Sequence, residues 1–244
     1  MQIAQITDIH IGHAGELHHG IDARAQFVQV LNQVNDIAPD AIVISGDLCF
    51  REPLDDTYQW IGQQIERCAC PVIIMAGNHD NQTVLQRHLP CSYHADTNEI
   101  YEATHWDGIP VLFLDTARAV ISEKQMQWMA GLLDGDLAQA IIFMHHPPLY
   151  CGVPHMDGKY AFQSIPAIQE FFTAFSGHLQ IFCGHYHVER SIQVANQSIH
   201  ITPSTFFQID ATRVEFHVDH HRPGYRIIEL DARGAIDSTC HYLP

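Results

Sequence analysis

The sequence predicts an α/β fold with two β-sheets. Between residues 3 and 78, apolar runs of strand length alternate with amphipathic segments of helix length, the pattern of a parallel sheet with right-handed crossovers. Polar clusters follow the apolar runs, as expected at the carboxyl ends of parallel strands. After residue 187, short apolar runs separated by turns replace the helices, which predicts a second, largely antiparallel sheet packed on the first.

The first part of the chain supplies the parallel sheet. Strands are predicted at 3–7, 41–44 and 71–75, and helices at 21–37 and 54–67. In the first helix Phe27, Leu31 and Val34 recur at helical spacing, and Pro39-Asp40 ends it. Asp8, Asp47 and Asn78 therefore each follow the end of a strand.

The rest of the chain continues in shorter elements. Residues 81–107 give a weaker pattern, with a short helix expected near 83–88, and 147–158 are expected to form a loop. Further strands are predicted at 111–114, 140–144 and 179–183, helices at 122–133 and 165–175, and hairpin strands at 191–194, 198–201, 206–209, 225–230 and 235–242. No repeat or linker divides the chain, so a single domain over 1–244 is expected.

Composition limits the function classes. The chain has 244 residues, of which 46% are hydrophobic and 16% charged, so a sizeable core is expected. A net charge of −16 argues against broad binding of nucleic acid. The seven cysteines have irregular spacing, which is typical of reduced thiols in a cytoplasmic protein. No signal peptide or membrane-spanning segment is visible, so a cytoplasmic location without membrane contact is expected.

Five polar clusters stand at predicted strand ends. They are Asp8-Ile9-His10, Gly46-Asp47, Gly77-Asn78-His79-Asp80, His145-His146-Pro147-Pro148 and Gly184-His185-Tyr186-His187. Residues two apart share one face of a strand, so Asp8 with His10, and His185 with His187, can converge on one ion. Carboxylate and imidazole ligands together suit Mn, Fe, Zn or Ni better than Ca or Mg.

The ligand set is too large for one ion and suits two ions that share Asp47. The candidate ligands are Asp8, His10, Asp47, Asn78, His145, His185 and His187. Two metal ions are the usual arrangement for hydrolysing phosphate esters, in which a bridging water loses a proton and attacks phosphorus. Asp47 and His79 are the candidate catalytic residues, with His79 donating a hydrogen bond to phosphate or protonating the leaving oxygen. The phosphate is expected to lie against His10, Asp47, Asn78, His79 and His187.

Each cluster alone has a simpler structural explanation. An Asp-x-His at a strand end is more often a turn with a hydrogen-bonded histidine, and the Asp of Gly46-Asp47 is favoured in turns for its side-chain hydrogen bond. The five clusters in one chain, each at a strand end, argue against coincidence. A serine-hydrolase triad has no Gly-x-Ser-x-Gly elbow here, and no glycine-rich phosphate loop is present. His146 and Asp80 are expected to support the site rather than bind metal.

These motifs resemble those of the calcineurin-like metallophosphoesterases. Within that superfamily the chain is similar to bacterial class III 3′,5′-cyclic nucleotide phosphodiesterases and related glycerophosphodiesterases. Further stretches carry this likeness: Gln5-Ile6-Thr7-Asp8, Phe113-Leu114-Asp115-Thr116, Met144-His145-His146-Pro147-Pro148-Leu149, Thr202-Pro203-Ser204-Thr205 and Pro223-Gly224-Tyr225-Arg226. The resemblance implies a four-layer α/β/β/α sandwich of two mixed β-sheets flanked by helices.

The resemblance also implies a division of the ligands. One ion would take Asp8, His10, Asp47 and His187, and the other Asp47, Asn78, His145 and His185. Fe and/or Mn are the expected ions, with Zn, Co or Ni as alternatives, and His79 corresponds to the phosphate-contacting histidine. The Asp-Arg-Gly that follows the Gly-Asp motif in phosphoprotein phosphatases is missing after Asp47, which argues against a protein substrate.

Three functional hypotheses follow. The first is hydrolysis of a 3′,5′-cyclic nucleotide, cyclic AMP foremost, to the 5′-monophosphate. The second keeps the chemistry but takes a glycerophosphodiester or another small diester, with the 149–160 loop, which holds His155 and Asp157, forming the substrate rim. The third is a non-catalytic metal-binding interaction module, which the complete ligand set disfavours. The sequence leaves open whether the chain forms a homo-oligomer.

Overall fold

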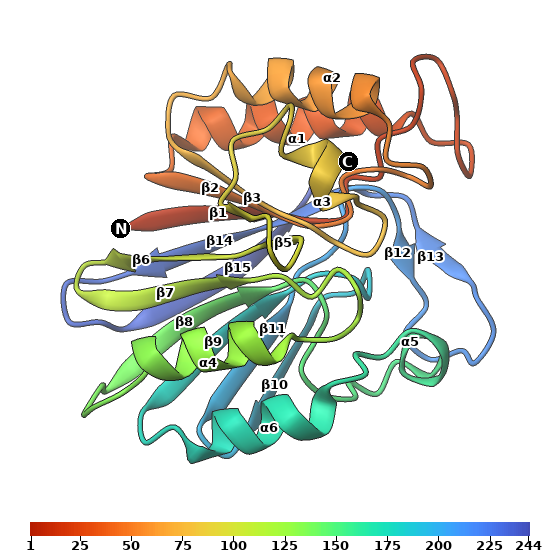
Figure 1. The fold of residues 1–244 in the computed structure, drawn as a ribbon. Coiled ribbons are helices and arrows are strands. Elements are labelled where there is room, and N and C mark those ends of the chain that lie inside the picture. Colours follow the sequence, from red (N-terminus) through yellow and green to blue (C-terminus); the bar gives the residue numbers. More distant parts are fainter.

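The computed structural model describes residues 1–244 and contains two large β-sheets between layers of helices (Figure 1). Helices α1 (Ala23–Ile37) and α2 (Asp55–Ile65) cover the first sheet, and α4 (Glu123–Leu132) and α6 (Ile165–Ala174) cover the second. The expected four-layer α/β/β/α sandwich of two mixed sheets is confirmed. None of the helices combines the length and the apolar character needed to span a lipid bilayer.

The first sheet has five strands in the order β15-β14-β1-β2-β3. These strands are β1 (Gln2–Ile6), β2 (Ala41–Ser45), β3 (Val72–Met75), β14 (Gly224–Leu230) and β15 (Ile236–Tyr242). Strands β1, β2 and β3 are parallel, as the sequence predicts, whereas β14 runs antiparallel to β1 and β15 antiparallel to β14.

The second sheet has six strands in the order β10-β11-β9-β8-β7-β6. These strands are β6 (Glu102–Trp106), β7 (Ile109–Leu114), β8 (Gln139–Met144), β9 (His178–Cys183), β10 (Arg190–Val194) and β11 (Gln197–Ile201). The four inner strands are parallel, and only the edge strands β6 and β10 run antiparallel.

The prediction of a largely antiparallel second sheet from the hairpins after residue 187 is therefore wrong. The hairpins form, but they divide between the sheets: β10 and β11 extend the parallel strands of the second sheet, and β14 and β15 complete the first. A hairpin pattern specifies one neighbour of each strand and leaves the other edge free. Here that free edge pairs with a parallel strand in one case and with β1 in the other.

The remaining elements are short. They are α3 (Gln82–Leu85), α5 (Pro154–Lys159), the paired strands β4 (Tyr93–His94) and β5 (Glu99–Ile100), and the paired strands β12 (Gln208–Ile209) and β13 (Val218–His220). Helix α5 overlaps the end of the segment 147–158, so the expectation of a loop is wrong for residues 154–158. Its Pro154 occupies the first helical turn, where the missing N–H costs no hydrogen bond.

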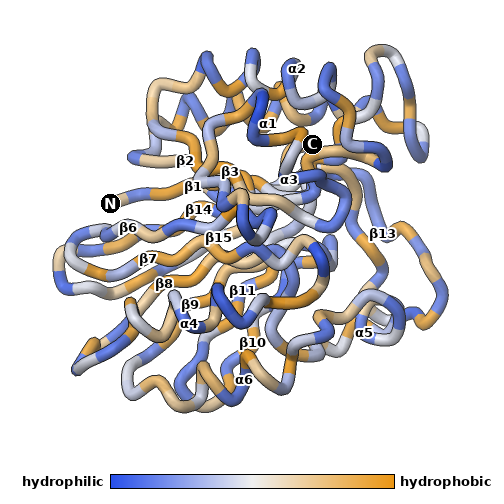
Figure 2. Tube along the Cα trace, viewed as in Figure 1, coloured by the Kyte–Doolittle hydropathy of each residue, from blue (hydrophilic) through white to orange (hydrophobic).

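The core between the sheets is aromatic and aliphatic. Phe113, Phe143 and Phe182, from three adjacent strands of the second sheet, stack with ring centroids 5.3 Å apart along the row. They belong to a buried cluster that also contains Ile3 and Val43 of the first sheet. Hydrophobic residues predominate along the inner strands, whereas hydrophobic and hydrophilic residues are interspersed along the helices (Figure 2). This packing fixes the two sheets against each other and therefore fixes the relative positions of their strand ends.

Candidate metal centre

Six of the seven predicted ligands form two adjacent clusters at the strand ends. In each cluster the ligand atoms lie within 4.8 Å of one another. The first cluster is Asp8, His10 and His187, and the second is Asp47, His145 and His185. All six side chains are buried. Asn78 lines the same cavity with an exposed side chain.

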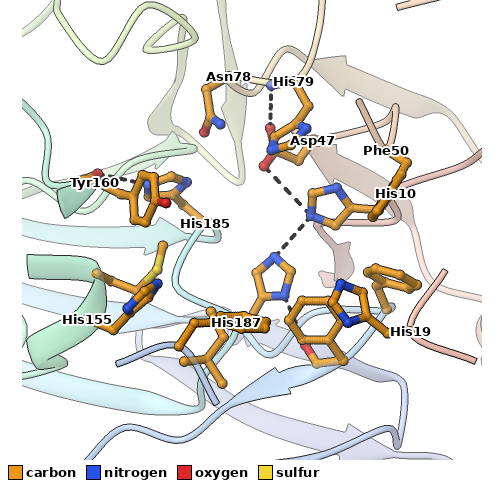
Figure 3. A pocket seen from close by; sticks show the side chains of 15 residues that line it. His10, His19, Asp47, Phe50, Asn78, His79, His155, Tyr160, His185 and His187 are labelled. Carbon is orange, nitrogen blue, oxygen red and sulfur yellow. Dashed lines mark hydrogen bonds and ion pairs between the residues drawn. The ribbon is translucent and has the colours of Figure 1, made fainter. Parts of the chain in front are cut away.

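The Asp47 carboxylate faces both clusters. Its Oδ2 atom lies 3.8 Å from His10 Nε2 and 3.3 Å from His145 Nε2. Its Oδ1 atom accepts a hydrogen bond of 2.9 Å from the main-chain N–H of His79 (Figure 3). One oxygen is thus held by the loop that follows β3, while the other points between the two histidine groups. This is the position that a carboxylate shared by two cations would need.

Main-chain carbonyls fix the tautomers of the four histidines. Three rings hydrogen-bond a carbonyl through Nδ1: His10 to Cys49 at 3.3 Å, His145 to Ser45 at 2.9 Å and His187 to Phe207 at 3.0 Å. His185 instead uses Nε2, which lies 2.9 Å from the carbonyl of Tyr160. Because a carbonyl only accepts, each of these nitrogens carries its proton, and the opposite nitrogen of each ring faces the clusters. Metal-binding histidines are held in this way.

The protein donors fit the metal ions that the resemblance implies. His10 Nε2 and His187 Nε2 lie 3.0 Å apart, so two nitrogen lone pairs face each other. His145 Nε2 is buried and forms no well-aligned hydrogen bond, although Asp47 Oδ2 lies 3.3 Å away. Buried polar atoms left unpaired in this way are costly unless a ligand or ion satisfies them. A cation in each cluster would satisfy these atoms.

The electrostatics of the clusters favour cation binding. Burial opposes ionisation of Asp8, but His187 and His145 outweigh it and lower its pKa to about 2. Burial lowers the pKa of His10 to about 3, against the attraction of Asp47. Although burial opposes the charged form of His145, the attraction of Asp47 outweighs it and raises the His145 pKa to about 9. Without metal, the proton on His145 therefore neutralises part of the carboxylate charge, and a cation would displace that proton.

Five candidate ligands have left-handed backbone conformations. The φ angles are 53° at Asp8, 45° at His10, 51° at Asp47, 67° at His185 and 51° at His187. For residues other than glycine this conformation is uncommon and costs free energy. Left-handed residues at the strand ends turn successive side chains toward one point. A continuing strand would instead place successive side chains on opposite faces of the sheet.

Two glycines permit the close approach of the ligand loops. A Cβ atom at Gly77 would overlap the main-chain nitrogen and the carboxylate of Asp47. A Cβ at Gly184 would overlap the side chains of Thr7 and Asp8. Glycine therefore precedes Asn78 and His185 because the neighbouring loop lies against its α-carbon.

Asp80 anchors these loops and joins neither cluster. Its carboxylate accepts hydrogen bonds from the main-chain N–H groups of Leu48, Cys49 and Gly77 at 2.8–3.3 Å, and from the Tyr58 hydroxyl at 3.0 Å. Burial and the nearby Asp47 raise the pKa of Asp80 to about 6. Asp80 thus ties the loop after β2 to the loop after β3.

The cavity beside the clusters has an aromatic wall that sequence reasoning missed. Its volume is about 390 Å³, and its lining includes Phe50, Phe206, Phe207 and Phe216 together with His19. Phe206 and Phe207 directly follow the Thr202–Thr205 stretch, so their position beside that motif was the available signal. Phe216 carries no signal in the sequence, because its approach to the cavity depends on the β12–β13 hairpin.

The segment 149–160, which is expected to form the substrate rim, lines the cavity only in part. His155, Met156 and Tyr160 line the cavity. Asp157 does not, because its carboxylate accepts hydrogen bonds from three main-chain N–H groups at the start of α5 and from the Tyr186 hydroxyl. The Asp157 carboxylate instead holds the segment that enters α5 against the helix.

Comparison with protein families agrees with this geometry. The model of the calcineurin-like phosphoesterase family matches residues 1–189, which contain all seven candidate ligands. The chain belongs to the calcineurin-like phosphoesterase family. The resemblance drawn from the strand-end motifs is thereby confirmed.

Relatives of this phosphoesterase carry related names. A probable cyclic nucleotide phosphodiesterase of Fibrobacter succinogenes is 33% identical over 232 residues, covering 94% of this chain and 89% of the relative. The 3′,5′-cyclic adenosine monophosphate phosphodiesterase CpdA of Escherichia coli K12 is 25% identical, covering 100% of this chain and 90% of the relative. The glycerophosphodiester phosphodiesterase GpdQ of Enterobacter lignolyticus is 29% identical, covering 86% of this chain and 79% of the relative.

Solved structures support the fold of this phosphoesterase. A dimetal phosphatase from Danio rerio superposes with a TM-score of 0.67 at 12% identity, covering 93% of this chain and 94% of the other. At this identity the likeness establishes the shared architecture only.

Proposed function

We propose that this phosphoesterase hydrolyses 3′,5′-cyclic nucleotides, with cyclic AMP foremost, to 5′-monophosphates. The observation that carries the proposal is the Asp47 carboxylate, which faces both His10 and His145. The relatives named as cyclic nucleotide phosphodiesterases, which cover nearly the whole chain, support the choice of substrate.

Two metal ions are part of the proposal. Asp8, His10 and His187 would hold one, and His145, His185 and Asn78 the other, with Asp47 shared. Fe and Mn are the ions we expect, since mixed carboxylate and imidazole sites suit first-row transition metals. Bound ions would supply a nucleophile at neutral pH and neutralise the charge on the phosphoryl oxygens.

The residues of the chain orient the substrate and move a proton. His79 lines the cavity, and its ring packs edge-on against the His10 ring with centroids 4.9 Å apart. We assign His79 the role of general acid, which donates a proton to the leaving 3′-oxygen. The bond from phosphorus to the 3′-oxygen breaks, the oxygen of a water molecule joins phosphorus, and the 3′-oxygen leaves as a hydroxyl group with the proton from His79. The proton that the water gives up returns to His79 through solvent, so the enzyme is regenerated. The polar atoms of His10, Asn78 and His187 are assigned to the phosphate.

The test is turnover of cyclic AMP by the purified protein with added Mn²⁺, compared with an Asp47→Ala variant. We expect the variant to lose activity by about a hundredfold or more, because changes even to groups that support metal ligands cost about 10–100-fold. Equal turnover by the two proteins, or none by either, would remove the cyclic nucleotide proposal.

A glycerophosphodiester is the second candidate substrate. The relative named as a glycerophosphodiester phosphodiesterase favours it. A panel of cyclic AMP, cyclic GMP, glycerophosphocholine and glycerophosphoethanolamine, compared by kcat/KM, separates the two candidates.

A further inference from the structure

Phe216 is an exposed aromatic residue at the mouth of the cavity. It lies between β12 and β13, and 44% of its surface is accessible. Its ring centroid lies 5.9 Å from that of His19, 5.6 Å from that of His155 and 5.8 Å from that of Phe207. Three segments far apart in the sequence thus meet at this one ring (Figure 3 labels His19 and His155).

The loop that carries Phe216 is tied down. The main-chain N–H of Asp210 donates to the carbonyl of His217 at 2.9 Å, which closes the loop. His155 Nδ1 lies 3.1 Å from the carbonyl of Val214 and binds the loop to α5. The ring is therefore presented to the cavity in a defined position, although much of it faces solvent.

An aromatic surface runs from Phe216 to the metal clusters. The rings of Phe207 and Phe206 lie next to each other, with centroids 4.8 Å apart. Phe207 in turn lies 4.9 Å from the His187 ring, and Phe206 lies 5.5 Å from the His10 ring. A phosphodiester bound at the clusters would therefore extend one of its ester groups along this row of rings.

The charges around the cavity favour a neutral planar group on that ester. No lysine or arginine lines the cavity, so a second anionic group would have no partner. Asp47 is the only carboxylate that lines it, so a cationic headgroup on that ester would find only the faces of the aromatic rings. Aromatic side chains bind nucleobases by stacking, with little dependence on the base, because every base has a π face.

We infer that Phe216, which packs against the buried Phe207, binds a planar ring on the substrate and determines preference for aromatic over aliphatic diesters. Phe206 and Phe207 are buried against the clusters, whereas Phe216 has a free surface. The inference rests on the proposed phosphodiesterase function, because it assumes that the phosphate of the substrate lies at the metal clusters. It adds that binding depends on the presence of a planar ring and not on which base that ring is.

The test compares two diesters with the same leaving group, bis(p-nitrophenyl) phosphate and methyl p-nitrophenyl phosphate, in the Mn²⁺-loaded protein. Phe216→Ala should lower kcat/KM for the aryl diester about tenfold, the scale of one lost stacking contact, and change the methyl diester less than about twofold. Phe216→Tyr keeps a ring and should retain the aryl preference. Val214→Ala is the control in the same loop. The Val214 side chain is 65% exposed and does not line the cavity, so this variant should change neither rate.

Cyclic AMP, cyclic GMP and glycerophosphocholine complete the comparison. We expect similar losses for both cyclic nucleotides in Phe216→Ala. Equal losses for the aryl and methyl diesters, or a Phe216-dependent preference for glycerophosphocholine, would overturn the inference. If cyclic nucleotides are not hydrolysed while the aryl diester still depends on Phe216, the proposed function fails and the ring-binding surface stands. If cyclic nucleotides are hydrolysed but hydrolysis of the aryl diester does not depend on Phe216, the proposed function stands and the ring-binding inference fails.

Discussion

The Nε2 atoms of His10 and His187 lie 3.0 Å apart, although the two residues are 177 positions apart in the chain. Each ring is held by a carbonyl at its Nδ1 atom, so neither ring can rotate without losing a buried hydrogen bond. Two lone pairs at this distance repel each other unless a cation lies against them. A metal ion bound by both nitrogens would relieve that repulsion.

Metal removal should therefore destabilise the protein. At free metal about a thousand times its dissociation constant, binding adds about 4 kcal/mol to the free energy of unfolding. For a chain of this size that corresponds to a fall in Tm of about 8–16 °C on chelation. Thermal melts followed by circular dichroism, before and after chelation and after adding back Mn²⁺, measure the effect. An unchanged Tm would show that the clusters bind no stabilising ion.

The metal-free protein should be most stable near pH 6.5. Burial lowers the pKa of His10 to about 3 and of His185 to about 4, and also lowers the pKa of His146. These groups bind protons more readily when unfolded, so stability is lost as the pH falls below 6.5. The pKa of His145 is raised to about 9, so its contribution is lost as the pH rises from 6.5. The pKa of Asp80 is raised to about 6, so its contribution to stability increases as the pH falls. This offsets part of the loss caused by the three histidines.

Urea unfolding of chelated protein at pH 5, 6.5 and 8 checks this profile. His185→Asn should flatten the acid side, because one of the groups responsible is gone. A free energy of unfolding that rises steadily toward pH 5 would contradict the assignment.

Tyr58→Phe should weaken the link between the loops after β2 and β3. The buried hydroxyl donates to Asp80 and accepts from the main-chain N–H of Asn81, both at 3.0 Å. Its removal takes one hydrogen bond from Asp80 and leaves the main-chain N–H of Asn81 without its acceptor, which costs about 1–3 kcal/mol and lowers Tm by several degrees. Tyr150→Phe, at a tyrosine that is 66% exposed, is the matched control and should leave Tm unchanged. Equal Tm values for the two variants would refute the anchoring role.

Gly77→Ala should displace Asp47. The new methyl group would overlap the Asp47 carboxylate, so the loop must move and metal affinity should fall at least about tenfold. Gly131→Ala, in α4 with open space around its α-carbon, should instead stabilise the protein by up to about 1 kcal/mol. Metal titration with both variants compares them. Retained affinity in Gly77→Ala would show that the close approach is not required.

Local signals in the sequence predicted which side chains meet at the strand ends. Asp8, Asp47 and Asn78 follow strands whose apolar runs are plain, and the parallel pattern brings such ends to one edge. The sheet assignment of the last strands could not be predicted, because β14 and β15 form a hairpin whose period does not reveal that β14 also pairs with β1. The position of Phe216 was hidden for a similar reason, since it depends on loop contacts with His155 and not on any periodic pattern.

The account depends most on two cations that share Asp47, and counting bound metal tests this directly. Metal-free protein would be titrated with Mn²⁺, the free ion removed, and the metal per chain measured by mass spectrometry. We expect two equivalents in the native protein and at most one in Asp47→Ala. One equivalent or fewer in the native protein, with the fold intact by circular dichroism, would contradict the shared-carboxylate centre.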